Sequence, residues 1–263
     1  MDKVLVTNDD GYKSIGFYPL LEELSESFDV IAVAPESEKS WIGKSISART
    51  KLKIEEKNIN GFKINTINGT PADCVQIGLY EILKKKPKMV ISGINLGENA
   101  GHARILSSGT VGAAMEASID GIKSICTSMY IPETIKRKTD FFNPKNYSLF
   151  KDSAKISAKL AGILSEIDLG KDIDIVSLNI PYGATIDSEF EVTIPFKEPY
   201  GRLFQRHGKE MIHRHPVLSF KEAKKGTDIH ALWEGKISIT PINLDLSNRH
   251  SIKFLSNIIK KEW

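Results

Sequence analysis

Residues 4–11 read VLVTNDDG, and this stretch decides the fold that we expect. The apolar run at its start predicts a buried strand, and Asp9 and Asp10 follow directly after that strand. In open α/β sheets, ligands bind at the carboxyl ends of the strands. Two adjacent carboxylates repel each other, so both stay ionised most easily beside a cation. Such oxygen ligands suit Mg²⁺ or Mn²⁺, although Asn-Asp-Asp-Gly is also a common turn sequence.

The chain up to Pro181 alternates short apolar runs with segments of helical periodicity. This alternation is typical of a mainly parallel sheet with helices on both faces, so we expect an α/β fold. One clear helix start is Thr70, which can cap a helix that has Pro71 at its first position. The predicted strands lie at residues 4–7, 30–34, 63–67, 89–92, 124–128 and 173–178. The predicted helices lie at residues 15–27, 70–83, 110–119 and 151–167.

The pattern changes after Pro181. Residues 190–194 and 236–240 look like strands, with weaker patterning between them, and residues 251–263 have the periodicity of an amphipathic helix. We therefore divide the chain into a catalytic core, residues 1–181, and a C-terminal extension, residues 182–263. The extension is expected to pack on the core or on another subunit, and not to form an independent domain.

The composition indicates an ordinary globular protein. The chain has 263 residues, of which 41% are hydrophobic and 26% charged, and this excludes disordered, collagen-like and disulfide-stapled proteins. The formal net charge of +3 is close to balance and argues against long nucleic acid as a partner. No apolar run is long enough to span a membrane, and Cys74 and Cys126 have the pattern of reduced, buried residues. We therefore expect a cytoplasmic protein.

A glycine-rich loop, SGINLGENAG at residues 92–101, follows one of the predicted strands. Its three glycines, spaced four apart, allow the backbone to approach a ligand closely. Asn95 and Asn99 offer neutral oxygens for a metal or a phosphate, and a plain flexible loop is the alternative. The spacing differs from the GxGxxG of dinucleotide-binding proteins.

A hydroxyl-rich helix start lies at residues 107–114, SSGTVGAA. Free N–H groups and the positive end of the helix dipole can bind an anion there, and capping by Ser108 or Thr110 is the alternative. Ser40 follows the second predicted strand at the same sheet edge. A P-loop is excluded, because Glu38 stands where its first glycine would be. Together these strand ends suit a divalent cation that holds a phosphate beside an attacking water.

His213 and His215 are spaced to share one face of a strand. Such a pair can bind a metal ion, but histidines at a surface or an interface are commoner. We treat a metal pair at this position as the weaker hypothesis.

These stretches together closely resemble the SurE family, the survival protein E phosphatases. Each matching segment is weak alone, but they occur in the order of the family, cover most of the chain and are specific in combination. They are VLVTNDDG at 4–11, VAPE at 33–36 with Ser40 after it, GTPADCV at 69–75, SGINLGENAG at 92–101, SGTVGAAMEA at 108–117 and GTDIHALWEGKISITP at 226–241.

The resemblance implies a Rossmann-like three-layer sandwich, with a C-terminal β-hairpin and helix exchanged between the subunits of a homodimer or homotetramer. It also implies a divalent-metal-dependent 5′-nucleotidase that removes phosphate from nucleoside 5′-monophosphates, with 3′-nucleotides and short polyphosphate as further substrates. One Mg²⁺ or Mn²⁺ per subunit would be held, by motif position, by Asp9, Asp10, Ser40 and Asn95. The phosphate would be held by Asn99, Ser108, Gly109 and Thr110.

Asp9 and Asp10 are the candidate catalytic residues, one of them as a general base. Water attack and an aspartyl-phosphate intermediate both remain open. The chain departs from the family at Trp41-Ile42-Gly43-Lys44, a bulkier loop that leaves the base preference open, and at His102 and Ser107. Two other classes of function also remain open. One is a nucleotide- or phosphate-binding regulatory protein without turnover, and the other is a stress-associated assembly protein that acts through its C-terminal extension.

Overall fold

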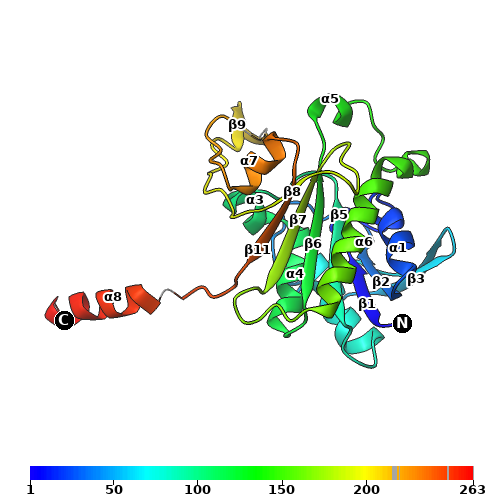
Figure 1. Cartoon of the computed structure of the whole chain (residues 1–263), viewed down its shortest axis with the longest axis horizontal. Coiled ribbons are helices and arrows are strands. Elements are labelled where there is room, and N and C mark those ends of the chain that lie inside the picture. The colour runs from blue at the N-terminus through cyan, green and yellow to red at the C-terminus, as the bar shows by residue number, and fades with distance from the viewer. Residues whose placement is uncertain (215–217, 219, 248, 263) are drawn as a thin grey trace.

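A nine-stranded sheet forms the centre of the molecule (Figure 1). The computed structural model describes residues 1–214, 218, 220–247 and 249–262. The strand order is β3-β4-β2-β1-β5-β6-β7-β11-β8, and all pairs are parallel except β3 with β4 and β7 with β11. The bounds are β1 (Lys3–Thr7), β2 (Asp29–Pro35), β3 (Ile54–Ile59), β4 (Phe62–Ile67), β5 (Met89–Asn95), β6 (Ser124–Tyr130), β7 (Ile175–Pro181), β8 (Phe190–Val192) and β11 (Ile237–Ile242).

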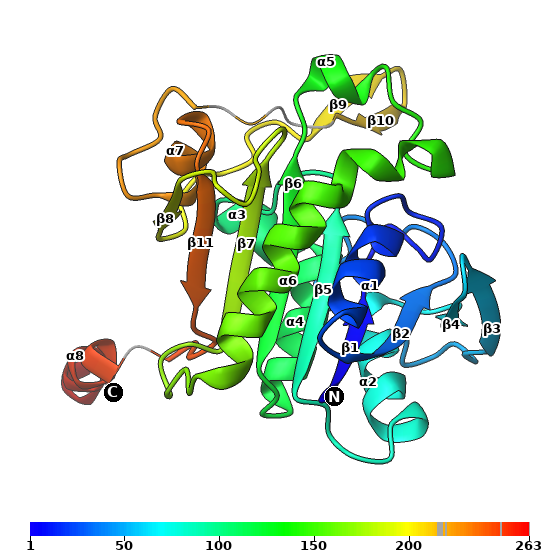
Figure 2. The same cartoon turned by 45° about the vertical axis from the view of Figure 1, so that its right-hand side comes forward.

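Helices cover both faces of this sheet, so the predicted three-layer α/β architecture is confirmed (Figure 2). One face carries α1 (Phe17–Ser25) and α6 (Lys151–Glu166), which contact each other. The other face carries α2 (Pro71–Ile77) and α4 (Gly109–Ile119), which also contact each other. Four shorter helices are α3 (His102–Ser107), α5 (Glu133–Lys136), the 3₁₀-helix η2 (Pro144–Phe150) and α7 (Asp228–Trp233).

The continuous apolar run of β1 follows from its central position in the sheet. Val4 and Val6 pack into the core beneath α1 and α6, whereas Leu5 packs into the core on the face of α2. Side chains of a strand alternate between the two faces, and both faces of this strand are covered by helices. All three residues are therefore buried, and the strand carries its polar residues only beyond its end.

The start of α2 confirms the predicted cap and also fixes the loop after β2. The Thr70 hydroxyl accepts a hydrogen bond of 3.1 Å from the Asp73 N–H, and Asp73 Oδ2 accepts one of 2.8 Å from the Thr70 N–H. Asp73 Oδ1 also accepts a bond of 3.0 Å from the Ser47 N–H. The capping carboxylate thus joins a helix on one sheet face to the loop that carries Ser40.

The short helices α3, α5, η2 and α7 were not predicted, and the observed elements differ from the predicted ones at three further places. The strand β3 was not predicted, because residues 55–57 are all charged and none of its side chains is buried. The predicted helix at residues 70–83 divides into α2 and a π-helix, η1 (Gly78–Ile82). The weakly patterned segment of the extension contains a hairpin of β9 (Phe204–His207) and β10 (Glu210–His213).

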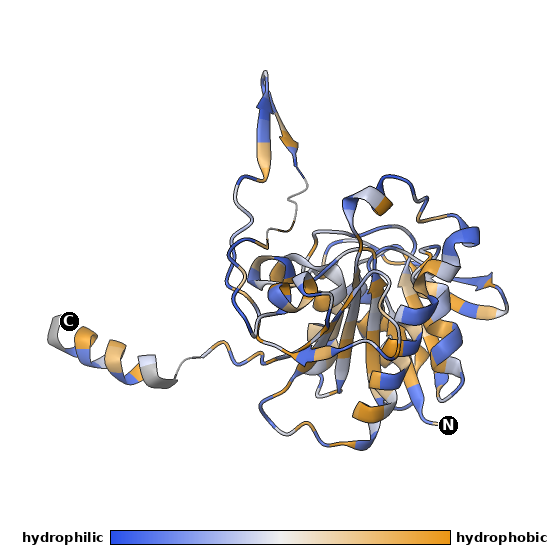
Figure 3. Cartoon of the chain, turned by 45° about the horizontal axis from the view of Figure 1, so that its top comes forward, coloured by the Kyte–Doolittle hydropathy of each residue, from blue (hydrophilic) through white to orange (hydrophobic). Residues whose placement is uncertain are grey.

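The last helix, α8 (Arg249–Glu262), lies apart from the sheet at the end of an extended segment (Figures 1 and 3). Within residues 1–214, 218, 220–247 and 249–262, no helix has the length and apolar character needed to cross a membrane. The apolar side chains of α8 are exposed, namely Ile252, Phe254, Leu255, Ile258 and Ile259.

Candidate active site

A cavity of about 630 Å³ lies at the carboxyl ends of the central strands. Because β2, β1 and β5 are parallel neighbours, the loops that follow them meet at one edge of the sheet. Gly109 and Thr110 follow at the start of α4. The lining includes residues that the sequence singled out, namely Asp9, Asp10, Ser40, Asn95, Asn99 and Ser108.

Asp9 and Asp10 are almost fully buried in the cavity wall, with 3% and 6% of their surface exposed. The Thr110 hydroxyl donates a hydrogen bond of 2.5 Å to Asp9 Oδ1, and the Leu96 N–H donates one of 3.0 Å to Asp10 Oδ2. Burial raises the pKa of Asp9 to about 6. Burial, and after it the charge of Asp9, raise the pKa of Asp10 well above its usual value. A cation beside the pair would favour the ionised form of both groups at neutral pH.

The loop after β2 brings Ser40 and a third carboxylate, Glu38, to the cavity. The Lys39 N–H donates a bond of 2.7 Å to the Asp9 carbonyl oxygen, which ties this loop to the end of β1. The exposed Ser40 hydroxyl donates a bond of 2.6 Å to Glu38 Oε1. The charge of Glu38 also contributes to the raised pKa of both aspartates. In the sequence, Glu38 served only to exclude a P-loop. The position of Glu38 beside Ser40 depends on how this loop folds back towards β1.

Asn95 and the start of α4 approach Asp9 from two sides. Asn95 Nδ2 donates to the Gly97 carbonyl oxygen at 2.6 Å, and Asn95 Oδ1 lies 3.4 Å from the Thr110 hydroxyl. That same hydroxyl donates to Asp9, so Thr110 holds the carboxylate in place. A Cβ at Gly109 would stand 2.8 Å from the Asp9 Cβ, closer than real Cβ contacts allow. The glycine therefore lets the helix start approach the aspartates closely.

Donors for an anion lie around the same helix start. Ser108 caps α4, since its Oγ accepts a bond of 3.1 Å from the Val111 N–H. Asn99 is held from two strands, because its Nδ2 donates to Ser128 Oγ at 2.8 Å and its N–H donates to Asn179 Oδ1 at 2.8 Å. Unpaired N–H groups and the positive dipole end of a helix favour an anion.

The cavity lining also contains cationic side chains that were not expected from the sequence, among them Arg104 and Lys136. Arg104 of α3 is 9% exposed, and its guanidinium lies 3.3 Å from Glu98 Oε1 and 3.7 Å from Glu198 Oε2. Lys136 of α5 also lines the cavity, and its charge lowers the pKa of Asp10. Neither residue lies in one of the motifs found in the sequence. Each reaches the cavity from a short helix whose position depends on tertiary packing.

Aromatic side chains also reach the cavity. Trp41, which is 41% exposed, lies against Tyr200 with ring centroids 5.1 Å apart, and the His213 ring lies 4.9 Å from the Trp41 ring. Trp41 has a φ of 62°, which is unusual for a large side chain. Tyr200 and His213 come from the C-terminal extension, so only the fold brings the three rings together.

The chain after Pro181 also holds the glycine-rich loop. Asp228 of α7 is fully buried, and its carboxylate accepts bonds of 2.6 Å from the Gly101 N–H and 2.9 Å from the Phe196 N–H. Burial raises the pKa of Asp228. This residue joins the end of the loop that carries Asn99 to the segment that leads to Tyr200. Asp228 lies in the family-matching segment at residues 226–241, but the sequence alone assigned it no role.

The positions that depart from the family lie at the rim of this site. Ser107 Oγ contacts the Tyr200 hydroxyl. His102 is exposed, and its Nδ1 lies 3.1 Å from the Phe196 carbonyl oxygen. Of the predicted histidine pair, His213 contacts Trp41, and His215 lies outside the described residues.

Comparison with known proteins identifies the family. The sequence model of the family described as "Survival protein SurE" matches residues 4–202. The chain is 34% identical to a protein of Archaeoglobus fulgidus over 93% of this chain and 92% of the relative. It is 36% identical to a protein of Methanocaldococcus jannaschii over 96% of each. Both relatives are named 5′-nucleotidase SurE.

The fold is also similar to that of a SurE protein. The crystal structure of the SurE protein from Aquifex aeolicus superposes with a TM-score of 0.76 at 33% sequence identity. The match covers 97% of this chain and 99% of that one. The similarity therefore includes the strands and helices of the C-terminal extension as well as the core. On sequence and on fold, the chain belongs to the SurE family.

Proposed function

We propose that the chain is a divalent-metal-dependent 5′-nucleotidase that hydrolyses nucleoside 5′-monophosphates. The proposal depends above all on the two buried aspartates at the end of β1, which lie beside the N-terminus of α4. Carboxylates favour a cation and a helix start favours an anion, and a metal-bound phosphate satisfies both. The name that the relatives carry, 5′-nucleotidase SurE, supports the same activity.

The proposed cofactor is one Mg²⁺ or Mn²⁺ per subunit. All four candidate ligands offer oxygen atoms, which these ions prefer. Both aspartates are buried, and the charge of Asp9 raises the pKa of Asp10, so the pair fits a cation beside it. When bound, the ion supplies positive charge for the phosphate and for the attacking water. The proposed ligands are Asp9, Asp10, Ser40 and Asn95.

The proposed reaction is the attack of a water oxygen on phosphorus as the bond from phosphorus to O5′ breaks. A carboxylate of the aspartate pair accepts the proton of the water, and the same carboxyl group then gives a proton to the departing nucleoside oxygen. N–H donors fixed at the start of α4 stabilise the negative charge on the phosphoryl oxygens, and Arg104 and Lys136 add positive charge. The same site would take the phosphate of 3′-nucleotides and short polyphosphate. The proposed phosphate-binding residues are Asn99, Ser108, Gly109 and Thr110.

The nucleoside base is proposed to stack on the aromatic side of the cavity. Trp41 and Tyr200 both line the cavity that contains the aspartates, and their rings already contact each other. A volume of about 630 Å³ is ample for a nucleotide. Stacking on an aromatic ring stabilises a bound base by about 1–3 kcal/mol with little selection among bases. This contact would make the site accept several nucleoside monophosphates.

We also propose that the C-terminal extension, residues 182–263, assembles the chain into a homodimer or homotetramer. The helix α8 lies apart from the sheet and exposes five large apolar side chains along its 14 residues. An exposed apolar patch of this kind is typical of an interaction surface. Exchange of α8 between subunits would bury this face against a second copy of the chain.

Asp9→Asn should lower phosphate release from AMP by about 10³-fold or more, a loss of about 4 kcal/mol in transition-state stabilisation. The substitution removes one charge from the proposed metal site and keeps the shape of the side chain. The measurement is phosphate release with Mg²⁺ or Mn²⁺, which EDTA should stop in the unmodified protein. Asp2→Asn, at an exposed position, is the matched control. Binding of AMP without phosphate release, with every metal tried, would instead support a regulatory protein.

Asp10→Asn should stabilise the metal-free protein at pH 7. Burial and repulsion raise the pKa of Asp10 in the folded state, so the folded protein binds the proton more tightly than the unfolded chain. This contribution to stability is present below the unfolded pKa of about 4 and is lost as the pH rises. The neutral amide avoids that loss, and we expect a melting temperature about 2–6 °C higher. Thermal unfolding in EDTA at pH 7 and pH 4 measures the effect, which should shrink at pH 4. A variant less stable than the unmodified protein at pH 7 would contradict this.

Trp41→Ala should raise KM for AMP by about tenfold, in line with the loss of one stacked ring. KM for ribose 5-phosphate, which has no base, should stay the same. Trp41→Phe keeps an aromatic ring and should restore most of the affinity for AMP. Steady-state kinetics on both substrates make the test. An equal change for both substrates would show that Trp41 positions the phosphate and not the base.

Removal of residues 245–263 should convert the oligomer to a smaller species, because it removes the exposed apolar face of α8. Light scattering after size-exclusion chromatography measures the mass. A full-length chain with Leu255→Lys and Ile258→Lys should behave in the same way while keeping the helix. If the unmodified chain is a monomer, or if both variants keep its mass, α8 is not the assembly element.

A further inference from the structure

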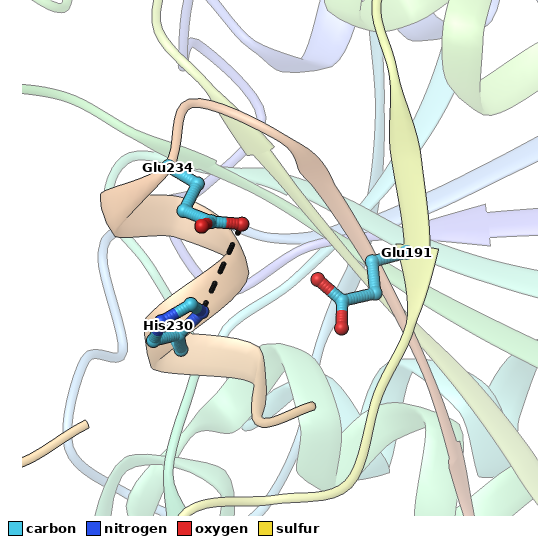
Figure 4. A group of neighbouring side chains, drawn as sticks. All are labelled: Glu191, His230 and Glu234. Carbon is cyan, nitrogen blue, oxygen red and sulfur yellow. Dashed lines mark ion pairs between the residues drawn. The ribbon is translucent and has the colours of Figure 1, made fainter. Parts of the chain in front are cut away.

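Three side chains able to bind a metal ion meet outside the cavity, between β8 and α7 (Figure 4). They are Glu191 of β8, His230 of α7 and Glu234 at the end of α7, and one ligand atom of each lies within 4.8 Å of those of the other two. β8 pairs with β11, and α7 packs on β11, so the sheet fixes the distance between the two elements. None of the three residues lines the active-site cavity.

His230 is the least expected member of this group. It is 9% exposed, and its Nδ1 has no hydrogen-bond partner among the described residues. That nitrogen faces Glu234 Oε2 at 3.9 Å, which is too long for a hydrogen bond. The Trp233 ring lies edge-on to the imidazole, with centroids 5.5 Å apart. A buried imidazole nitrogen without a partner costs free energy, and a metal ion would satisfy it.

The charges around the group leave room for a cation. The nearby acidic residues are Glu189, Glu191 and Glu234, and the nearby basic residues are Lys225 and Lys236. Lys236 donates a bond of 2.8 Å to Glu234 Oε2 and lies 3.8 Å from Glu189. A carboxylate has several acceptor positions, so Lys236 can hold Glu234 in place while another lone pair of Glu234 binds a metal ion. With His230 neutral, the carboxylates exceed the lysines by one.

We propose that Glu191, His230 and Glu234 form a second metal site, which binds Zn²⁺ or a similar divalent transition-metal ion. One imidazole and two carboxylates are a ligand set that suits Zn²⁺, unlike the all-oxygen set of the active site. Two ligand atoms that are each about 2.1 Å from a tetrahedral ion lie about 3.4 Å from each other. Side-chain rotations that move the three ligand atoms by about 1 Å would therefore bring them to the distances that the ion requires. An ion there would join β8 to α7 and thereby stabilise the C-terminal extension.

The test uses the full-length chain with Asp9→Asn and Asp10→Asn, which removes the proposed catalytic metal site. Equilibrium dialysis of the metal-free protein against Zn²⁺, read by elemental analysis, should show one bound ion per chain. Adding His230→Ala should weaken this binding at least tenfold, and adding Glu191→Gln should weaken it similarly if the alanine variant does not fold. His207→Ala, at an exposed position, should leave it unchanged.

The same substitutions separate this site from catalysis. In the chain with intact aspartates, His230→Ala should leave Mg²⁺-dependent phosphate release from AMP unchanged but abolish the rise in melting temperature that Zn²⁺ produces. Absence of a bound Zn²⁺ in the Asp9→Asn, Asp10→Asn chain would overturn the proposal, as would binding that neither His230→Ala nor Glu191→Gln weakens. Either result leaves the proposed nucleotidase activity untouched.

Discussion

The repulsion between Asp9 and Asp10, buried side by side at the end of β1, is the constraint on which the site depends. Burial disfavours charge on either carboxylate, and the charge of Asp9 further disfavours the ionised form of Asp10. Three groups from different elements stabilise the negative charge: the Thr110 hydroxyl, the Leu96 N–H and the positive dipole end of α4. These donors reduce the cost of ionising the two aspartates, and a cation bound beside them, as proposed, would reduce it further. The proposed metal site would therefore lower the stability of the metal-free chain at neutral pH.

Much of the fold could be predicted because β1 and its neighbours are buried on both faces. Burial on both faces requires continuous apolar runs, which are the strongest local signal in a sequence. The signal fails where one face of a strand is exposed, as in β3, and in the hairpin β9–β10, whose residues are mostly exposed. The capped start of α2 was predictable for another reason, since Thr70 and Pro71 act within one turn of helix.

The residues of the candidate site also differ in how far they could be predicted from the sequence. Asp9, Asp10, Asn95 and Ser108 were found because each lies at a strand end or helix start that the sequence itself marks, and the structure brings them to one cavity. Their roles remain predictions. Glu38, Arg104 and Tyr200 were missed, because each reaches the cavity through a loop or short helix whose path is set by contacts distant in sequence. Asp228 is the extreme case, as it acts on the backbone of Gly101, 127 positions earlier in the chain.

The contact between Asp228 and Gly101 links the C-terminal extension to the candidate site. The strand β11 continues the core sheet beside β7, and α7 presents Asp228 to the loop that carries Asn99. Tyr200, from the segment between them, supplies part of the aromatic wall. The extension is thus joined to the cavity by a buried carboxylate and a ring contact, and only α8 stands clear of the sheet. Because Asp228 lies on α7, the packing of α7 on β11 also places this carboxylate beside the Gly101 N–H. A structural metal ion at Glu191, His230 and Glu234 would stabilise the packing of α7 beside β8, whereas the proposed role of the extension in assembly depends on α8.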